Sequence, residues 1–358
     1  ASFETEWETN ADKGNARTAR AQLLQSKTRD LYEAGSRRAR RASDRPGAGS
    51  AVHDRRNAAD PAAAHLFTGR GGRLFSAGRT GHLGGACRAK TGYAVFNADD
   101  PRVLEASKRT RAKTIYFSKD RKHPALRENL KRGNINVTVR DEAVIIQRPD
   151  GISWIAEIME IPITFEGQAQ FNIENALAAT AAAYALGISE EQIRAGLVSF
   201  SPSVGQSPGR MNMIDIGDCK VLIDYGHNIG AIHATGEFVR NLMPGKKIRM
   251  ASGVGNRREE DIIAYGKALA QYYDHIVLCD ASHRIRKLGE TADLVRRGLL
   301  EGGFSDEQIT IELKEKDATQ TALDLAGPGD LLVLQVENIA QVTQDVIDYK
   351  RKFTRHTN

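Results

Sequence analysis

Short apolar segments that alternate with helical stretches run through the C-terminal part of the chain, and they constrain its fold most strongly. The predicted strands are 221–224, 247–251, 275–279, 308–313 and 331–336, and each is followed by a predicted helix. This alternation indicates a mostly parallel sheet that is covered on both faces by helices. Ligands of such sheets bind outside the carboxyl ends of the strands. The functional residues are therefore expected in the loops that follow these strands.

A smaller α/β unit is predicted upstream of this sheet. Its expected strands are 93–96, 114–117, 135–139, 143–147 and 152–160, the last three as antiparallel neighbours. Asp100 is a predicted N-cap for a helix that begins at Pro101. An Ala-rich helix is expected over 171–186, with Gly187 after its end, and Ser189 caps the next helix.

A segment rich in Ser, Pro and Gly, residues 201–209, is the predicted linker between the two units. After it, 211–216 and 220–223 are expected to pair as a hairpin around Gly217 and Asp218. We therefore divide the chain into residues 1–90, a smaller α/β domain at 91–206, and a C-terminal domain at 207–358.

Residues 1–90 have an unusual composition. Leu, Ile, Val and Phe number only 10 of these 90 residues, which is too few to form a core, so we expect a disordered or poorly structured segment. The segment carries a charge of +8, from 17 basic and 9 acidic residues, whereas the rest of the chain carries −2. No aromatic residue interrupts the arginine run at 37–41, which argues against a nucleic-acid-binding arm.

Other bulk features favour a cytoplasmic protein. Cys87, Cys219 and Cys279 fit neither a disulfide framework nor a zinc site, so reduced thiols are expected. No apolar run is long enough to span a membrane, and no secretory signal opens the chain. Because the first residue is Ala1 rather than Met, we expect a fragment or a processed product.

Three loops at the expected carboxyl edge of the C-terminal sheet carry polar residues suited to an anionic ligand. They are Asp-Tyr-Gly-His-Asn at 224–228, Ser-Gly-Val-Gly-Asn-Arg-Arg at 252–258, and Asp-Ala-Ser-His-Arg-Ile-Arg at 280–286. Guanidinium groups bind carboxylates and phosphates, and glycines let backbone N–H groups approach an anion. Alternatively, Asp224 caps the next helix and the arginines form a solvated rim.

Two further features point to a nucleotide. Asn172 and Asn175 are three residues apart, on one face of the Ala-rich helix, although Asn172 could instead be its N-cap. Arg210 leaves the linker where two domains meet, a common place for a ligand. The isolated pair Gly253 and Gly255 is weak support, because Gly-x-Gly is common.

Taken in order, these motifs resemble the Mur ligase superfamily, and most closely the Mur-like module of the cyanophycin synthetase family. The resemblance covers roughly residues 91–350. It rests on Asn-Ala-Asp-Asp-Pro at 97–101, Phe-Asn-Ile-Glu-Asn-Ala-Leu-Ala-Ala at 171–179, Pro-Gly-Arg at 208–210, the loop at 224–228, and Gly-Val-Gly-Asn-Arg-Arg-Glu-Glu-Asp at 253–261. It implies an α/β fold in which a Mur ligase-type C-terminal domain, a Rossmann-like sheet with flanking helices, follows a partial central domain.

The resemblance also implies an activity. The family uses ATP and Mg²⁺ to turn a carboxylate into an acyl phosphate that an amine then attacks. In cyanophycin synthetases this module adds arginine to the aspartate side chains of a poly-aspartate (cyanophycin) primer, and the family forms homo-oligomers. The alternatives from other classes are a non-catalytic remnant or assembly module, and another Mur-type ligase such as a folylpolyglutamate synthetase relative.

Site residues follow from the same resemblance. It implies that Asn175 contacts the adenine and Asn172 shapes the same helix start. Arg210 would reach the ribose or a phosphate, and Asp224 would accept hydrogen bonds from the ribose hydroxyls. The remaining expected roles lie near the reaction: His227 and Asn228 face the acyl phosphate and the amine, and Arg257 helps hold the second substrate.

The sequence departs from the family pattern in several places. Gly226, Ile229 and Asn256 stand where the pattern has Ala, Pro and Asp. More seriously, the P-loop Gly-Lys-Thr and the Glu and His that bind Mg²⁺ in the family are absent, so no metal ligand is assigned. We therefore expect that this chain alone does not turn over ATP.

One hypothesis accounts for both anomalies. Residues 1–90 stand where the P-loop half of the central domain belongs, and their Ala, Arg and Gly bias is what a GC-rich gene yields out of frame. The register would be regained near Thr91. The upstream DNA tests this idea, because a shifted frame must then encode Gly-Lys-Thr.

Overall fold

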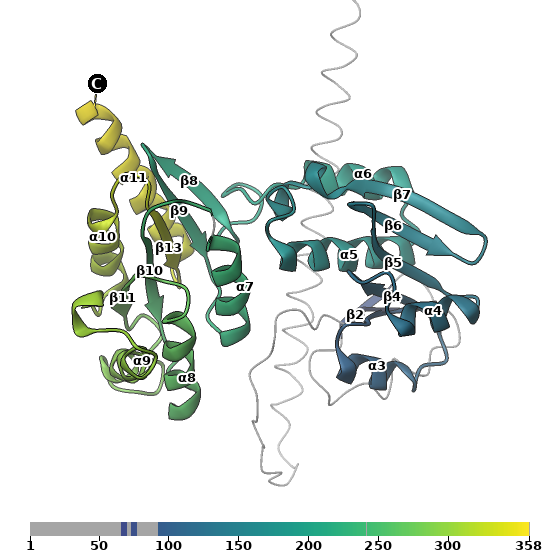
Figure 1. Cartoon of the computed structure of the whole chain (residues 1–358), viewed down its shortest axis with the longest axis horizontal. Helices are drawn as coiled ribbons and strands as arrows, with labels where there is room; N and C mark the ends of the chain where they lie inside the picture. Colours follow the sequence, from purple (N-terminus) through teal and green to yellow (C-terminus); the bar gives the residue numbers. More distant parts are fainter. Residues whose placement is uncertain (1–65, 70–72, 77–91, 241, 358) are drawn as a thin grey trace, which may run out of the picture. The chain divides into compact units, whose positions relative to one another are not determined.

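A computed structural model describes residues 66–69, 73–76, 92–240 and 242–357, which all fall in the unit formed by residues 58–358 (Figure 1). In this part of the chain the elements form two sheets. The first sheet has the strand order β2-β1-β3-β4-β5-β6-β7. Its strands are β1 (Leu66–Gly69), β2 (Arg73–Ser76), β3 (Tyr93–Asn97), β4 (Lys113–Ser118), β5 (Ile135–Arg140), β6 (Ala143–Arg148) and β7 (Gly151–Glu157).

The first sheet is mixed. Strands β3, β4 and β5 are parallel, and the other neighbouring pairs are antiparallel, as predicted for β5, β6 and β7. The predicted strand 152–160 is shorter than expected. It ends at Glu157, where a capping box begins the 3-10 helix η1 (Ile158–Glu160), and η2 (Pro162–Thr164) follows.

Four helices accompany this sheet in the described residues: α3 (Pro101–Ser107), α4 (Pro124–Lys131), α5 (Gln170–Ala185) and α6 (Glu190–Ser199). The predicted caps are confirmed. Asp100 accepts hydrogen bonds from two backbone N–H groups of α3, and Ser189 forms a capping box with Gln192. The alanines of α5 allow this helix to pack closely on the sheet, and Ala176 and Ala181 are fully buried in the core.

Within residues 1–90, β1 and β2 are described, and both are strands that the low apolar content did not predict. They form a hairpin, and β1 also pairs with β3. The expected disorder of the remaining residues up to Lys90 and the arginine run at 37–41 lie outside the described residues, and so does Cys87.

The second sheet confirms the predicted alternation of strands and helices. Its order is β12-β11-β10-β13-β9-β8, and every neighbouring pair is parallel except the hairpin of β8 with β9. The strands are β8 (Asn212–Ile216), β9 (Cys219–Asp224), β10 (Lys247–Ser252), β11 (His275–Cys279), β12 (Ile309–Ile311) and β13 (Leu331–Gln335). The helices are α7 (Ile229–Val239), α8 (Glu259–Leu269), α9 (Glu290–Glu301), α10 (Glu315–Leu325) and α11 (Ile339–Thr357), with the 3-10 helix η3 (Asp306–Gln308) before β12.

Helices cover both faces of the second sheet. One core contains residues of α7, α8 and α9, and the other contains residues of α10 and α11. Strand β9 contributes to both, because successive side chains point to opposite faces: Leu222 joins the first core, and Val221 and Ile223 join the second. Strand β9 is thus fixed from both sides, and it delivers Asp224 to the carboxyl edge.

Two free cysteines are described, Cys219 and Cys279, and both are buried. Burial raises the pKa of the Cys219 thiol to about 11 and that of Cys279 to about 12. Among the described helices, none combines the length and the apolar character that crossing a bilayer requires. The proposed domain boundary at residue 206 lies in the connection between α6 and β8.

Candidate functional site

Asp224 is the last residue of β9, and both oxygens of its carboxylate accept hydrogen bonds from backbone N–H groups. One carboxylate oxygen, Oδ2, accepts from the backbone N–H of Gly226 at 2.7 Å, and Oδ1 accepts from that of Met211 at 3.2 Å. The next helix, α7, is instead capped by Asn228, whose Oδ1 accepts from the Ala231 N–H at 2.9 Å. The alternative in which Asp224 caps this helix is therefore wrong.

Gly226 explains one departure from the family pattern. A Cβ at this position would lie 2.6 Å from Oδ2 of Asp224 and 3.1 Å from the Cβ of Ala231. Both distances are below normal contact, so the side chain of alanine would displace the carboxylate from its bond to the Gly226 N–H. Glycine here permits this particular orientation of Asp224.

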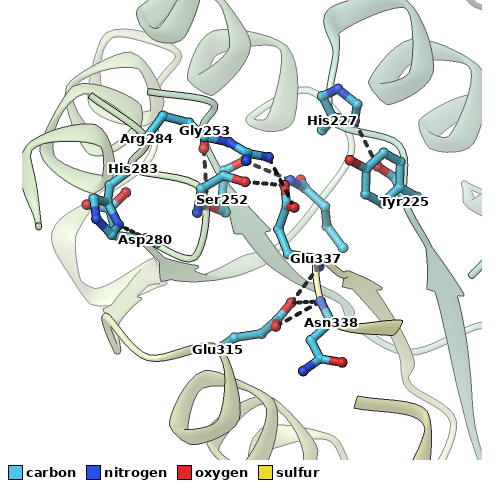
Figure 2. Close-up of polar contacts among 12 residues, drawn as sticks. Tyr225, His227, Ser252, Gly253, Asp280, His283, Arg284, Glu315, Glu337 and Asn338 are labelled. Carbon is cyan, nitrogen blue, oxygen red and sulfur yellow. Dashed lines mark hydrogen bonds and ion pairs between the residues drawn. The ribbon is translucent and has the colours of Figure 1, made fainter. Parts of the chain in front are cut away.

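Tyr225 connects two of the predicted site residues. Its ring lies edge-on to the ring of His227, with centroids 4.9 Å apart, and its carbonyl oxygen lies 3.1 Å from His227 Nδ1 (Figure 2). The guanidinium of Arg210 lies 5.1 Å from the centroid of the Tyr225 ring, a cation–π arrangement. Tyr225 was not among the predicted site residues, although its place between Asp224 and His227 was a signal.

Asn172 and Asn175 lie on α5 as expected, but Asn172 is not its N-cap. The helix begins at Gln170 with Ala169 as N-cap, so the capping alternative is wrong. The side chain of Asn172 instead donates to the carbonyl of Ile163 at 2.6 Å and accepts from Asn175 Nδ2 at 3.0 Å. Asn172 thus fixes the direction of the amide of Asn175.

A pocket of about 530 Å³ brings six of the seven predicted site residues together. This volume is within the range of small-molecule sites. Its predicted members are Asn172, Asn175, Arg210, Asp224, His227 and Asn228. Its largest apolar and aromatic members are Ile163, Phe171, Phe200, Met211 and Tyr225. The pocket therefore combines apolar and aromatic surfaces with a carboxylate, three amides, an imidazole and a guanidinium.

Arg257 is the predicted site residue that does not line this pocket. It lies in the second loop, which contacts the third loop: the Gly255 N–H donates to the Ser282 carbonyl at 2.9 Å. A Cβ on Gly255 would lie 1.8 Å from the carbonyl oxygen of His283, and a Cβ on Gly253 would lie 2.6 Å from Thr291. Gly255 therefore allows close packing between the two loops, and Gly253 allows close packing against α9.

A second polar cluster lies on the third loop and the segment after β13 (Figure 2). The Ser282 hydroxyl donates to Glu337, and Arg284 donates to the other oxygen of the same carboxylate at 3.3 Å. The carboxylate of Glu315 accepts from the backbone N–H of Glu337 at 2.6 Å and from that of Asn338. Glu337 was not among the predicted site residues, although it directly follows the last predicted strand, 331–336.

Asp280 begins the third loop and is almost completely buried. Its Oδ2 accepts from the Gly289 N–H at 2.5 Å, and Oδ1 has no hydrogen-bond partner in the described part of the chain. Burial raises the pKa of this carboxyl above its ordinary value. No group of three or more His, Cys, Asp or Glu side chains that could hold a metal ion occurs among the described residues.

Comparison with known proteins places the chain in a family. Residues 86–183 match the Mur ligase middle domain, and residues 209–335 match the Mur ligase, glutamate ligase domain. Cyanophycin synthetase from a Nostoc species is 36% identical over 251 residues, which are 70% of this chain and 28% of that protein. A UDP-N-acetylmuramoyl-L-alanyl-D-glutamate--2,6-diaminopimelate ligase from Corynebacterium efficiens is 27% identical over 214 residues, 55% of this chain and 39% of that protein.

Among solved structures, MurF from Acinetobacter baumannii is similar with a TM-score of 0.49 and 19% identity, over 74% of this chain and 56% of that one. The chain spans about 28% of the length of the cyanophycin synthetase that it matches. The two family domains, in this order, account for both sheets from β3 onward. The chain therefore belongs to the Mur ligase superfamily, as a ligase module similar to that of cyanophycin synthetases.

Proposed function

We propose that the pocket binds the adenosine part of ATP and that the chain is part of an ATP-dependent ligase. The observation that carries this proposal is that Asn172, Asn175, Arg210, Asp224, His227 and Asn228 line one pocket. These residues come from α5, from the first position after the linker, and from the end of β9 with the loop that follows it. Their meeting in one cavity of about 530 Å³ supports a common ligand.

Each residue suits a different part of the nucleotide. The amide of Asn175, oriented by Asn172, can both donate to and accept from the edge of adenine. Asp224 is 8% exposed, and each of its oxygens retains a lone pair for a ribose hydroxyl beside its bond to a backbone N–H. Arg210, which lies over Tyr225, supplies a cation for the ribose or a phosphate.

The reaction that we propose follows from the chemistry of carboxylates. A carboxylate is a poor electrophile, and ATP activates it as an acyl phosphate, with Mg²⁺ supplying charge when it is bound. His227 and Asn228 line the pocket on the side of the loop that precedes α7, where they can face the acyl phosphate and the incoming amine. We assign Arg257, outside the pocket, to the second substrate.

The substrates that we propose are arginine and an aspartate side chain of a poly-aspartate or cyanophycin primer. The identity of 36% to a cyanophycin synthetase, against 27% to a diaminopimelate ligase, favours this choice over another Mur-type ligase such as a folylpolyglutamate synthetase relative. By the same resemblance we propose a homo-oligomer. Two buried thiols and the use of ATP fit a location in the cytoplasm.

We further propose that this chain alone binds nucleotide weakly and does not turn over ATP. The 358 residues contain no Gly-Lys-Thr, the motif whose backbone and lysine hold the β- and γ-phosphates. The same observation favours a second candidate function, a non-catalytic module that keeps the fold for assembly. ATP turnover by a frame-corrected protein with arginine and primer separates the two, since the assembly module would release ADP only at background rate.

Calorimetry with AMP, ADP and ATP tests the nucleotide site. We expect the three to bind about equally, because only adenosine and the first phosphate find partners. The substitution Asp224→Ala should weaken all three alike, by about 1.5 to 3 kcal/mol, the contribution of a hydrogen bond to a charged group. The matched control is Asp215→Ala, which removes a carboxylate that is 62% exposed from the partner strand β8 and should change nothing.

Two results would contradict the proposal. Equal binding by the wild type and Asp224→Ala would mean that Asp224 does not contact the nucleotide. A strong, Mg²⁺-dependent preference for ATP would mean that the chain supplies a phosphate site outside the residues that we assign.

A further inference from the structure

Arg249 lies in the middle of β10 and is completely buried. Its exposed fraction is 0%, and it is one of the largest fully buried side chains among the described residues. Arginine is rarely buried to this extent unless it is paired, because removing a charge from water is costly. Arg249 does not line the candidate nucleotide pocket, and the proposed reaction does not use it.

The partners of Arg249 are neutral groups. Nη1 donates to the hydroxyl of Tyr273 at 2.8 Å, and Nη2 donates to the backbone carbonyl of Gly226 at 3.0 Å. The guanidinium lies 5.2 Å from the centroid of the Tyr273 ring, and Nε has no hydrogen-bond partner in the described residues. Burial lowers the pKa of Arg249, but the tyrosines Tyr273 and Tyr265 and the carboxylate of Asp224 outweigh it and raise the pKa overall. A guanidinium is not deprotonated in proteins, so Arg249 stays charged.

These contacts place Gly226 between two charged groups. Its N–H donates to the carboxylate of Asp224, and its carbonyl accepts from Arg249. Residues 224–228 line the candidate nucleotide pocket, whereas Arg249 lies in β10 and does not line it. Through its bond to the Gly226 carbonyl, this cation acts on the pocket in two ways: it fixes the backbone of the loop, and it partly offsets the charge of Asp224.

We propose that Arg249 is a positioning residue of the nucleotide pocket, which holds the loop at 224–228 in place and favours nucleotides that carry phosphate over adenosine. The second part rests on the proposed function. Without Arg249, the negative charge of the Asp224 carboxylate beside the ribose would be less fully compensated, with Arg210 as the remaining cation of the pocket. This charge would repel the phosphate of AMP and would leave neutral adenosine unaffected.

Three substitutions separate these effects. Arg249→Met removes both the charge and the hydrogen bonds. Arg249→Gln removes the charge but keeps an amide donor, and Arg249→Lys keeps the charge. The matched control is Thr319→Val. Thr319 is fully buried and contacts Met250, which follows Arg249 in β10 and points to the opposite face of the sheet.

The first readout is hydrogen exchange of the peptide that contains residues 224–228, corrected for global unfolding. We expect exchange to be about tenfold faster in Arg249→Met, the effect of losing one charge-assisted hydrogen bond, and unchanged in Thr319→Val. The second readout is the ratio of the dissociation constants of AMP and adenosine. This ratio should rise about fivefold in Arg249→Met and Arg249→Gln, as expected for one partly screened charge, and should stay at the wild-type value in Arg249→Lys.

Loop exchange in Arg249→Met that equals that of Thr319→Val would overturn the positioning role. An unchanged ratio in both neutral variants, or a rise in Arg249→Lys as large as theirs, would overturn the role of the charge. If Arg249→Met does not fold, Arg249→Gln carries both readouts, because a neutral amide bonds the Gly226 carbonyl more weakly than the guanidinium does and should still speed exchange of the loop relative to Thr319→Val. A wild-type chain that binds neither AMP nor adenosine would refute the proposed nucleotide site and the preference for phosphate, and the exchange comparison would still decide the positioning role.

Discussion

Gly255→Ala tests the interpretation that the glycine pair of the second loop exists for packing. The residue has little free space: a Cβ there would lie 1.8 Å from the carbonyl oxygen of His283 and 2.4 Å from its carbonyl carbon. Both atoms are backbone, so no side-chain rotation relieves the overlap. The loops at 252–258 and 280–286 must separate.

The expected loss of stability follows from this geometry. Ordinary contact begins at 3.4 Å, so the two backbones must move apart by 3.4 − 1.8 = 1.6 Å. Such overpacking costs about 1 to 3 kcal/mol. The movement also breaks the bond from the Gly255 N–H to the Ser282 carbonyl, whose net contribution is about 0.5 to 1.5 kcal/mol. Alanine also restricts the unfolded chain, and this effect stabilises the folded state by about 0.4 to 1 kcal/mol. The net destabilisation is therefore about 0.5 to 4 kcal/mol, with a central value of about 2 kcal/mol.

Equilibrium unfolding in urea, followed by circular dichroism, measures this change. Gly205→Ala is the matched control, because a Cβ at Gly205 meets no atom within 4 Å and its backbone is not left-handed. We expect the control to stay within about 0.5 kcal/mol of the wild type, as is usual for surface substitutions. A free energy of unfolding for Gly255→Ala that is equally close to the wild type would refute the packing interpretation and reopen an anion-binding role for the glycines.

Two further substitutions test the first and third loops. Gly226→Ala introduces a Cβ 2.6 Å from Asp224 Oδ2. We expect this substitution to weaken AMP binding, measured by calorimetry, by about 1 to 3 kcal/mol. An unchanged affinity would show that the orientation of Asp224 does not matter. Asp280→Asn tests the raised pKa of Asp280. Because the folded protein binds the proton of this carboxyl group more tightly than the unfolded chain does, the protonated carboxyl stabilises the fold in acid. This stabilisation is lost as the pH rises from the ordinary pKa of 3.8 through the raised pKa of the folded state. Urea unfolding between about pH 4 and pH 7 should therefore show a smaller decline in stability for Asp280→Asn than for the wild type, and parallel curves would contradict this reasoning.

The C-terminal sheet could be predicted because its signals are local. Buried parallel strands such as β9 and β13 read as continuous apolar runs, and helices of ordinary length separate them. The carboxyl edge follows from the parallel direction alone. The prediction that three loops share this edge is confirmed by the register of β9, β13, β10 and β11.

The grouping of those loops could not be predicted from strand order. The first loop faces α5 and the linker in the pocket, whereas the second and third loops contact each other. This division separates Arg257 from the other predicted residues. A sequence places residues at an edge but does not say which neighbours they face, because that depends on side-chain contacts between distant segments.

The start of α5 shows how a local signal can mislead. Asn172 precedes an apolar, Ala-rich run and has the side chain of a good N-cap. In the structure the carbonyl of Ala169 already accepts from the Asn172 N–H, so the helix begins earlier. The amide of Asn172 is then free to bond the carbonyl of Ile163, which lies outside the helix. The contact with Ile163 thus determines that the side chain of Asn172 bonds a distant carbonyl and does not cap the helix.

Arg249 is the residue for which sequence reasoning had least to offer. Within Lys-Ile-Arg-Met-Ala-Ser at 247–252, a charge between apolar residues normally marks an exposed face of an edge strand. Strand β10 instead lies between β11 and β13, so both of its faces are covered. The guanidinium is accommodated only because Gly226 and Tyr273, 23 and 24 residues away, present a carbonyl and a hydroxyl to it. A buried cation that contacts the loop of the candidate pocket is difficult to explain by stability alone, since an apolar side chain of similar volume would avoid the desolvation of the charge. This desolvation cost is what the positioning role that we propose for Arg249 at the loop 224–228 would account for.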